Sequence, residues 1–187
     1  MFYYFNQIIF DINNEDKIVE KYEQLLLNRD LKKEEEYCKL FLDTRKKLVF
    51  NHFDFWKNLE ITYKFFFEIK KLYEEKKIDI VVVSKKNKNS ILERFETYDF
   101  HLEANKVFAR EALDKYSTKG EFMKEYMQQN NIQSAIFVDD NYNNLKTTEN
   151  IPNIENILAL WGNSQPNLSG YNQEEAIEKI KNYCISK

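Results

Sequence analysis

Short runs of apolar residues alternate along the chain with longer segments whose apolar positions recur at helical spacing. Four of these runs are continuous enough to predict strands that are buried on both faces of a sheet: residues 4–10, 78–83, 135–138 and 157–161. The segments with helical spacing predict helices over residues 58–77, 90–97, 118–130 and 172–184. Strands and helices that alternate in this way predict an α/β fold with a Rossmann-like central parallel sheet flanked by helices.

Capping residues predict the first residues of three of these helices more closely. Each start combines a residue that caps a helix with a glutamate three positions later, an arrangement that satisfies two free backbone N–H groups reciprocally. The pairs are Ser90 with Glu93, Thr118 with Glu121, and Asn172 with Glu175. We therefore expect these helices to begin at the three capping residues.

The segment 15–55 interrupts the alternation of strands and helices. It carries charged segments with helical character at residues 16–28 and 31–47 and has no convincing strand. No low-complexity linker separates it from its surroundings. We expect a helical insertion over residues 15–55, and an α/β core made of residues 1–14 and 56–187.

Composition narrows the classes of partner. The 187 residues, 43% hydrophobic and 32% charged, suffice for one globular domain with an insertion. The 28 Lys and Arg against 31 Asp and Glu argue against a nucleic acid or an anionic membrane as partner, because phosphate-backbone binding needs concentrated positive charge.

No apolar run is long enough to cross a bilayer and the N-terminal segment lacks a basic start, so we expect a cytoplasmic protein. Cys38 and Cys184, far apart and without a metal-ligand spacing, are expected to be free, buried thiols. The oligomeric state stays open.

Polar side chains follow three of the predicted strands. Asp11 follows the first strand, Ser84 follows the second, and Asp139 and Asp140 end the third, while Lys119 opens a helix. The carboxyl ends of parallel strands meet at one edge of a sheet, where ligands of such folds bind. Three carboxylates brought together repel one another unless a cation neutralises them, so the pattern predicts a metal site at this edge.

Phosphoryl transfer to a carboxylate is the chemistry that needs this set of residues. Mg²⁺ takes a few oxygen ligands, which Asp11, a backbone carbonyl and Asp140 could supply. Asp11 would attack phosphorus as the nucleophile, and Ser84 and Lys119 would hold the phosphate oxygens and offset their charge. Receiver domains use the same ingredients, but there the acidic pair comes first in the chain, whereas here a lone aspartate comes first and the pair comes last.

In this order of motifs the chain resembles the haloacid dehalogenase (HAD) superfamily, and the resemblance covers nearly the whole chain. The four motifs are Ile8-Ile9-Phe10-Asp11-Ile12-Asn13, Ile80-Val81-Val82-Val83-Ser84, Ser117-Thr118-Lys119-Gly120, and Asp139-Asp140-Asn141-Tyr142-Asn143-Asn144. The fourth is the most specific. The long interval between the first two motifs fits the small helical cap of this superfamily, so the resemblance implies that residues 15–55 cover the site.

The resemblance also implies a role for each matched residue. Asp11 would be nucleophile and metal ligand, Asp140 a metal ligand, and Asp139 a support for the metal or its water. Ser84 and Lys119 would bind phosphate, with Asn144 steadying Lys119. Lys85, which follows Ser84 directly, could add positive charge beside the phosphate, or it could lie in a solvated loop.

Two positions depart from the pattern of this superfamily. Its phosphatases carry a second Asp two residues after the nucleophile, where this chain has Asn13, and Glu15 stands where Thr is usual. An amide exchanges no protons near neutral pH, so general acid and base catalysis, typically worth about 10² to 10⁴ in rate, is expected to be missing at this position. The backbone carbonyl of Asn13 can still bind Mg²⁺.

Three hypotheses about function follow. In the first, the protein is a Mg²⁺-dependent phosphatase or phosphotransferase that acts on a small phosphorylated metabolite through an aspartyl-phosphate on Asp11. Its hydrolysis is then either slow or assisted by another group, such as Glu15, Asp16 or the substrate itself. In the second, it is catalytically impaired and binds Mg²⁺ and a phosphorylated ligand as a sensor, subunit or scaffold. In the third, the same scaffold cleaves a carbon–phosphorus or carbon–halogen bond. The presence of both Asp139 and Asp140 argues against dehalogenation, which needs no metal.

Several further residues carry weaker signals. An aromatic cluster ends the insertion, and it predicts either packing at the base of the cap or a stacking surface for a base or sugar. Its members are Phe50, Phe53, Phe55 and Trp56. His52 and His101 are isolated and are expected to be surface or packing residues. Gly162, after the last predicted strand, is expected to permit a turn.

Overall fold

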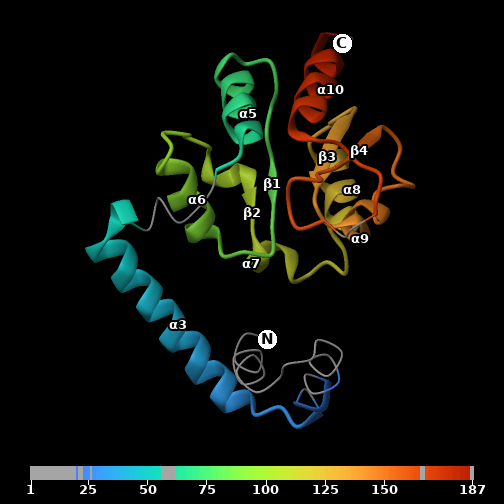
Figure 1. Ribbon diagram of the computed structural model, residues 1–187. Coiled ribbons are helices and arrows are strands. Elements are labelled where there is room, and N and C mark those ends of the chain that lie inside the picture. Colours follow the sequence, from blue (N-terminus) through green and yellow to red (C-terminus); the bar gives the residue numbers. More distant parts are fainter. Residues whose placement is uncertain (1–19, 21–22, 26, 56–61, 165–166, 186–187) are drawn as a thin grey trace. The chain divides into compact units, whose positions relative to one another are not determined.

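A computed structural model of the chain describes residues 20, 23–25, 27–55, 62–164 and 167–185 (Figure 1). The chain divides into two compact units, Met1–Ile61 and Thr62–Lys187. Several sequence predictions lie outside the described residues. They are the first strand at residues 4–10, Asp11, Asn13, Glu15, Trp56 and most of the helix predicted over residues 16–28.

The first unit contains one long helix, α3, Leu31–Asn51. It begins there because Asp30 caps it, its side chain accepting a hydrogen bond from the Lys33 N–H at 3.1 Å. The helix confirms the predicted segment and extends four residues beyond its expected end at residue 47. None of its side chains is buried, and Phe50 is 88% exposed. The expectation of a buried thiol is therefore wrong for Cys38, which is free but exposed on this helix, while Cys184 in the second unit is free and partly buried.

The second unit alternates short strands with helices (Figure 1). Its elements are α5 (Lys64–Glu74), β1 (Val82–Val83), α6 (Lys88–Glu96), the 3₁₀ turn η1 (Ala104–Lys106), β2 (Val107–Phe108), α7 (Arg110–Leu113), α8 (Lys119–Gln129), β3 (Ala135–Asp139), α9 (Tyr142–Lys146), β4 (Ile154–Leu158) and α10 (Gln173–Ile185). This order confirms an α/β fold.

The described strands form two parallel pairs. β1 pairs with β2, Val82 opposite Val107, and β3 pairs with β4, Ala135 opposite Ile154 through to Asp139 opposite Leu158. The parallel direction agrees with the sequence prediction. In the described part of the chain, however, the strands make two two-stranded sheets and not one continuous Rossmann-like sheet.

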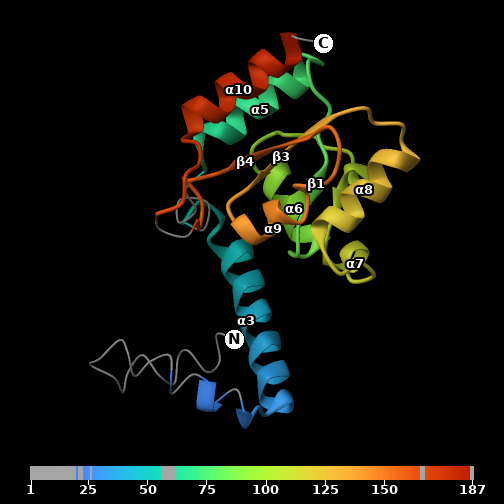
Figure 2. The same ribbon diagram turned by 90° about the vertical axis from the view of Figure 1, so that its right-hand side faces the viewer.

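The β3–β4 sheet is covered by helices on both faces (Figure 2). Phe137 and Leu158 pack against α8 and α9 on one face. Ile136, Val138 and Ile157 pack against α5 and α10 on the other. Neighbouring residues of β3 point to opposite faces, as the period of a strand requires. Because both faces are apolar, β3 reads in the sequence as a continuous hydrophobic run.

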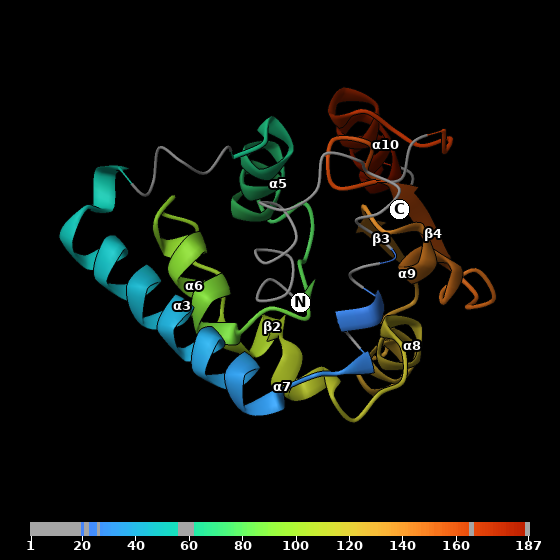
Figure 3. The same ribbon diagram turned by 60° about the horizontal axis from the view of Figure 1, so that its bottom comes forward.

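The two sheets share one core. Val83 of β1 and Phe108 of β2 pack against the same cluster as Phe137 and Leu158. The ring of Phe108 lies 4.8 Å from that of Phe122 in α8. Helix α8 therefore contacts residues of both sheets, and α9 lies beside it (Figure 3).

A separate aromatic cluster joins α5 to α6. The rings of Phe66, Phe95 and Phe100 lie 4.8 to 5.5 Å apart, and Phe100 is only 2% exposed. For these residues the high aromatic content serves the packing of the core.

Four predicted elements have wrong boundaries. The helix predicted over residues 58–77 is α5, which begins at Lys64 after the non-helical residues 62–63 and ends at Glu74, before a turn over residues 75–77. The last strand occupies Ile154–Leu158 and not residues 157–161, because Glu155 and Asn156 interrupt its apolar pattern. The strand predicted over residues 78–83 shrinks to Val82–Val83. Helix α6 starts earlier than expected, since the cap is Asn87 and not Ser90; the Asn87 side chain accepts from the Ser90 N–H.

Two of the predicted caps are confirmed. The Thr118 hydroxyl accepts from the Glu121 N–H at 3.1 Å, and the side chains of Asn172 and Glu175 bond each other's backbone N–H groups at 3.0 and 2.8 Å. β2, α7 and α9 were not predicted, because elements of two to five residues are too short to show a periodicity.

Candidate active site

A largely buried ion pair joins the start of α8 to the end of β3. The Lys119 ammonium donates to Oδ2 of Asp139 at 2.7 Å, and the two side chains are 13% and 6% exposed. Lys119 stands at this point because Thr118 caps the helix immediately before it. Asp139 stands at the carboxyl end of β3, as the sequence predicts.

Two further donors fix the carboxylate of Asp139. The Asn144 amide lies 3.1 Å from both carboxylate oxygens, and the Asn141 N–H donates to Oδ1 at 2.8 Å. Asn144 therefore acts on Lys119 through Asp139. With both oxygens engaged, the Asp139 carboxylate is fixed in a position that orients the ammonium group; its role at a metal stays a prediction.

The first turn of α8 is pressed against the turn after α9. The Gly120 N–H donates to the Thr147 hydroxyl at 3.0 Å, and that hydroxyl lies 2.6 Å from the Asn144 carbonyl oxygen. A Cβ at Gly120 would lie 2.0 Å from the Thr147 carbonyl oxygen. Thr147 is not among the residues predicted from the sequence; the glycine directly after Lys119 is the signal that could have indicated a close neighbour.

Asp140 carries the second carboxylate of the pair. Its Oδ2 accepts from the Asn163 N–H at 2.7 Å, and within the described part of the chain no hydrogen bond or ion pair reaches Oδ1. A carboxylate with one uncommitted oxygen suits a hard cation such as Mg²⁺. The described residues contain no group of three or more His, Cys, Asp or Glu side chains that could hold a metal ion. The third predicted carboxylate, Asp11, lies outside them.

Ser84 lies at the carboxyl end of the other strand pair. Its N–H donates to the Phe108 carbonyl at 3.0 Å, which continues the β1–β2 pairing, and its Oγ accepts from the Lys86 N–H at 3.2 Å. The adjacent Lys85 is exposed. No hydrogen bond in the described part of the chain joins Ser84 to Lys119 or Asp139.

The structure thus brings part of the predicted set together. Lys119, Asp139 and Asn144 form one bonded network, with Asp140 next to it in the chain. Ser84 is not part of this bonded network in the described part of the chain. Its neighbour Val83 packs against the hydrophobic cluster that also contains Phe137 of β3. His101, predicted as a surface residue, is 76% exposed and contacts Glu96.

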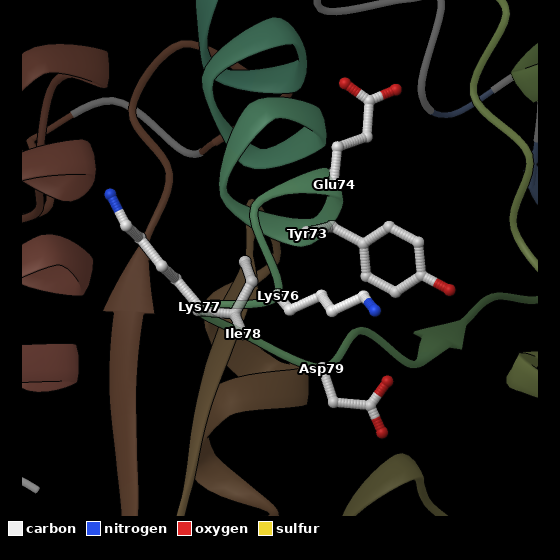
Figure 4. A pocket seen from close by; sticks show the side chains of 6 residues that line it. All are labelled: Tyr73, Glu74, Lys76, Lys77, Ile78 and Asp79. Carbon is white, nitrogen blue, oxygen red and sulfur yellow. The ribbon is translucent and has the colours of Figure 1, made fainter.

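Two cavities lined by described residues of the second unit lie away from this network. One of about 510 Å³ precedes β1 and is lined by the residues labelled in Figure 4, among them Tyr73, Lys76 and Asp79. Another of about 600 Å³ lies against α10, beside Glu155 and Lys179. None of the predicted site residues lines either cavity.

Comparisons with known proteins add no relative. No protein-family model, curated protein or solved structure matches this chain significantly. In the described part of the chain, no helix combines the length and the apolar character needed to cross a membrane.

Proposed function

We propose that this protein is a Mg²⁺-dependent phosphatase or phosphotransferase that acts on a small phosphorylated metabolite through an aspartyl-phosphate on Asp11. The observation that carries the proposal is the network of Lys119, Asp139 and Asn144 beside a carboxylate with a free oxygen. A desolvated ammonium group held by a carboxylate is suited to bind phosphate, and a carboxylate with a free oxygen is suited to bind a cation. The resemblance of the four motifs to the HAD superfamily supports the same function.

The proposed chemistry proceeds in two displacements at phosphorus. A carboxylate oxygen of Asp11 attacks phosphorus while the bond to the ester oxygen breaks, and that oxygen takes its proton from solvent. Water then attacks the phosphorus atom, the bond to Asp11 breaks and inorganic phosphate leaves. Lys119 and Ser84 hold the phosphate oxygens throughout, and bound Mg²⁺ would neutralise part of their charge. Asp140 and the carbonyl of Asn13 would hold the cation with Asp11.

Because Asn13 replaces the usual Asp, this mechanism predicts a low turnover rate that depends on the acidity of the leaving alcohol. The Asn13 amide neither protonates the leaving group nor activates water, so both displacements depend on solvent. Slow turnover follows, with esters of acidic alcohols reacting fastest because their oxygens leave without a proton. Replacing Asn13 by Asp supplies the missing acid and base and should raise the rate by about 10² to 10⁴.

The test is Mg²⁺-dependent release of phosphate from a panel of small phosphomonoesters. The wild-type protein is compared with Asp11→Asn, Asn13→Asp and the neighbouring control Asn14→Asp. We expect slow release by the wild type, none by Asp11→Asn, a gain in Asn13→Asp and no gain in Asn14→Asp. Release that persists in Asp11→Asn would contradict the proposal.

Asn13 also favours a second candidate function, a protein that binds Mg²⁺ and a phosphorylated ligand without turnover. The same assay separates the two functions. If the wild type releases no phosphate from any ester and Asn13→Asp does, the site is intact but lacks one catalytic group. A sensor, subunit or scaffold role would then replace the catalytic one.

A further inference from the structure

The carboxylate of Asp140 is in close contact with the chain that follows β4. We name residues 159–164 the β4 loop. In this loop the Asn163 N–H donates to Oδ2 of Asp140 at 2.7 Å. A Cβ at Gly162 would lie 2.5 Å from Cβ of Asp140 and 2.6 Å from its Oδ2. The φ of Gly162 is not positive, so the close approach to Asp140, and not a left-handed backbone, is the reason for glycine at this position.

The β4 loop is itself firmly held. The Ala159 N–H donates to the Asp139 carbonyl oxygen at 3.0 Å, which extends the β3–β4 pairing by one step. The Trp161 ring packs against Phe65 of α5, with ring centroids 4.9 Å apart. Because the loop is fixed at these points, the Asn163 N–H meets Asp140 in a preset position.

The contacts make the two oxygens of Asp140 unequal. Oδ2 is engaged by Asn163, whereas no hydrogen bond or ion pair among the described residues reaches Oδ1. We propose that Gly162 and the Asn163 N–H are positioning groups that fix the rotamer of Asp140, so that Oδ1 is the oxygen offered to a cation. Partners of this kind commonly change metal affinity by about 10- to 100-fold when they are lost.

This inference rests on the proposed role of Asp140 as a metal ligand, so its test measures cation binding and not activity. Mn²⁺ is the probe: its free concentration is followed by electron paramagnetic resonance, and competition with Mg²⁺ confirms a shared site. Gly162→Ala pushes the Asp140 carboxylate away, and Asn163→Pro removes the N–H that holds it. We expect each to weaken Mn²⁺ binding by about 10- to 100-fold.

Two control variants separate positioning from general strain. Gly170→Ala introduces a similar clash, 2.7 Å from the Leu158 carbonyl oxygen, but away from Asp140. Asn163→Ala removes the side chain and keeps the N–H. Both should bind Mn²⁺ within about twofold of the wild type, since neither touches the carboxylate. Thermal melting of each variant, with and without metal, identifies any that fails to fold.

The outcomes distinguish this inference from the proposed function. If the wild type binds Mn²⁺ and a folded Gly162→Ala or Asn163→Pro binds it equally well, the positioning role is overturned while the metal site stands. If the wild type and Asp140→Asn both fail to bind Mn²⁺, the metal-dependent function is overturned, and the inference with it. Should Gly162→Ala not fold, Asn163→Pro against Asn163→Ala decides the question.

Discussion

The ammonium group of Lys119 lies 2.7 Å from Oδ2 of Asp139, although 20 residues of chain separate the two. The pair ties the start of α8 to the end of β3 and is almost closed to solvent. Surface pairs contribute little to stability, but a desolvated pair that loses one member leaves a buried charge without its partner.

Substitutions of Lys119 and Asp139 should therefore each lower the free energy of unfolding, and their effects should not be additive. We expect Lys119→Met and Asp139→Asn each to reduce the free energy of unfolding by about 2 kcal/mol, and the double variant to lose less than the sum by about 1 kcal/mol. Urea denaturation of the four proteins measures the coupling. Lys124→Met, at an exposed position of the same helix, should change stability by less than about 0.5 kcal/mol. Strict additivity would show that the pair contributes no coupling.

Gly120→Ala should destabilise the protein although alanine is the better helix former. Helix propensity alone would stabilise by about 1 kcal/mol. The added Cβ would lie 2.0 Å from the Thr147 carbonyl oxygen, a backbone atom that cannot rotate away. We expect a net loss of about 1 to 3 kcal/mol in the free energy of unfolding. The matched control is Lys124→Ala; a Gly120→Ala variant as stable as the control would mean that α8 and α9 separate without cost.

Thr148→Val tests a fully buried hydroxyl. Thr148 is 0% exposed, and its Oγ1 lies 2.7 Å from the Leu145 carbonyl oxygen and 2.8 Å from Oδ1 of Asn156. Valine keeps the shape but leaves Oδ1 of Asn156 without this donor, which should cost about 1 to 3 kcal/mol, whereas the Leu145 carbonyl still accepts from the Thr148 N–H and the Asn156 amide. Thermal or urea unfolding measures the loss. The same substitution at Thr97, more accessible to water, should cost no more than about 0.5 kcal/mol, and equal losses at both sites would argue against a specific buried bond.

Acid should weaken the contact between α5 and α10. The hydrogen bond from Lys181 to Glu68, 2.8 Å long, and the charge of Lys181 hold the pKa of Glu68 below its ordinary value. Since the folded state favours the carboxylate, this contribution is present above the unfolded pKa of about 4.3 and is lost as pH falls through the lower folded pKa. Its size is under about 1 kcal/mol, because the pair is partly exposed.

Lys181→Met is the variant for this pH effect. Its stability deficit against the wild type should be present at pH 7 and should disappear in acid below the folded pKa of Glu68. The pKa of Glu68, followed by nuclear magnetic resonance, should rise in the variant. A pKa unchanged by the substitution would show that the ion pair does not form in solution.

Local patterns in the sequence determined much of the second unit. The continuous apolar run at residues 135–138 predicted β3, and the caps at Thr118 and Asn172 predicted the starts of α8 and α10 within one residue. These signals are reliable because a buried strand and a capped helix each depend on residues close together in the chain. The same patterns located Lys119 at a helix start and Asp139 at a strand end, whereas the distance between them comes from the structure.

Tertiary structure decided what local patterns cannot specify. The polar Asn156 lies within β4 because Thr148, eight residues away, satisfies its side chain. Nothing in the local sequence shows that Gly120 lies against Thr147 or that Gly162 lies against Asp140; these close contacts are visible only in the structure. The sequence by itself determined the α/β alternation and the positions of Lys119 at a helix start and Asp139 at a strand end. Which carboxylate oxygens are engaged and which stay free was decided by contacts between elements, since packing distances depend on how distant segments meet and not on their order in the chain.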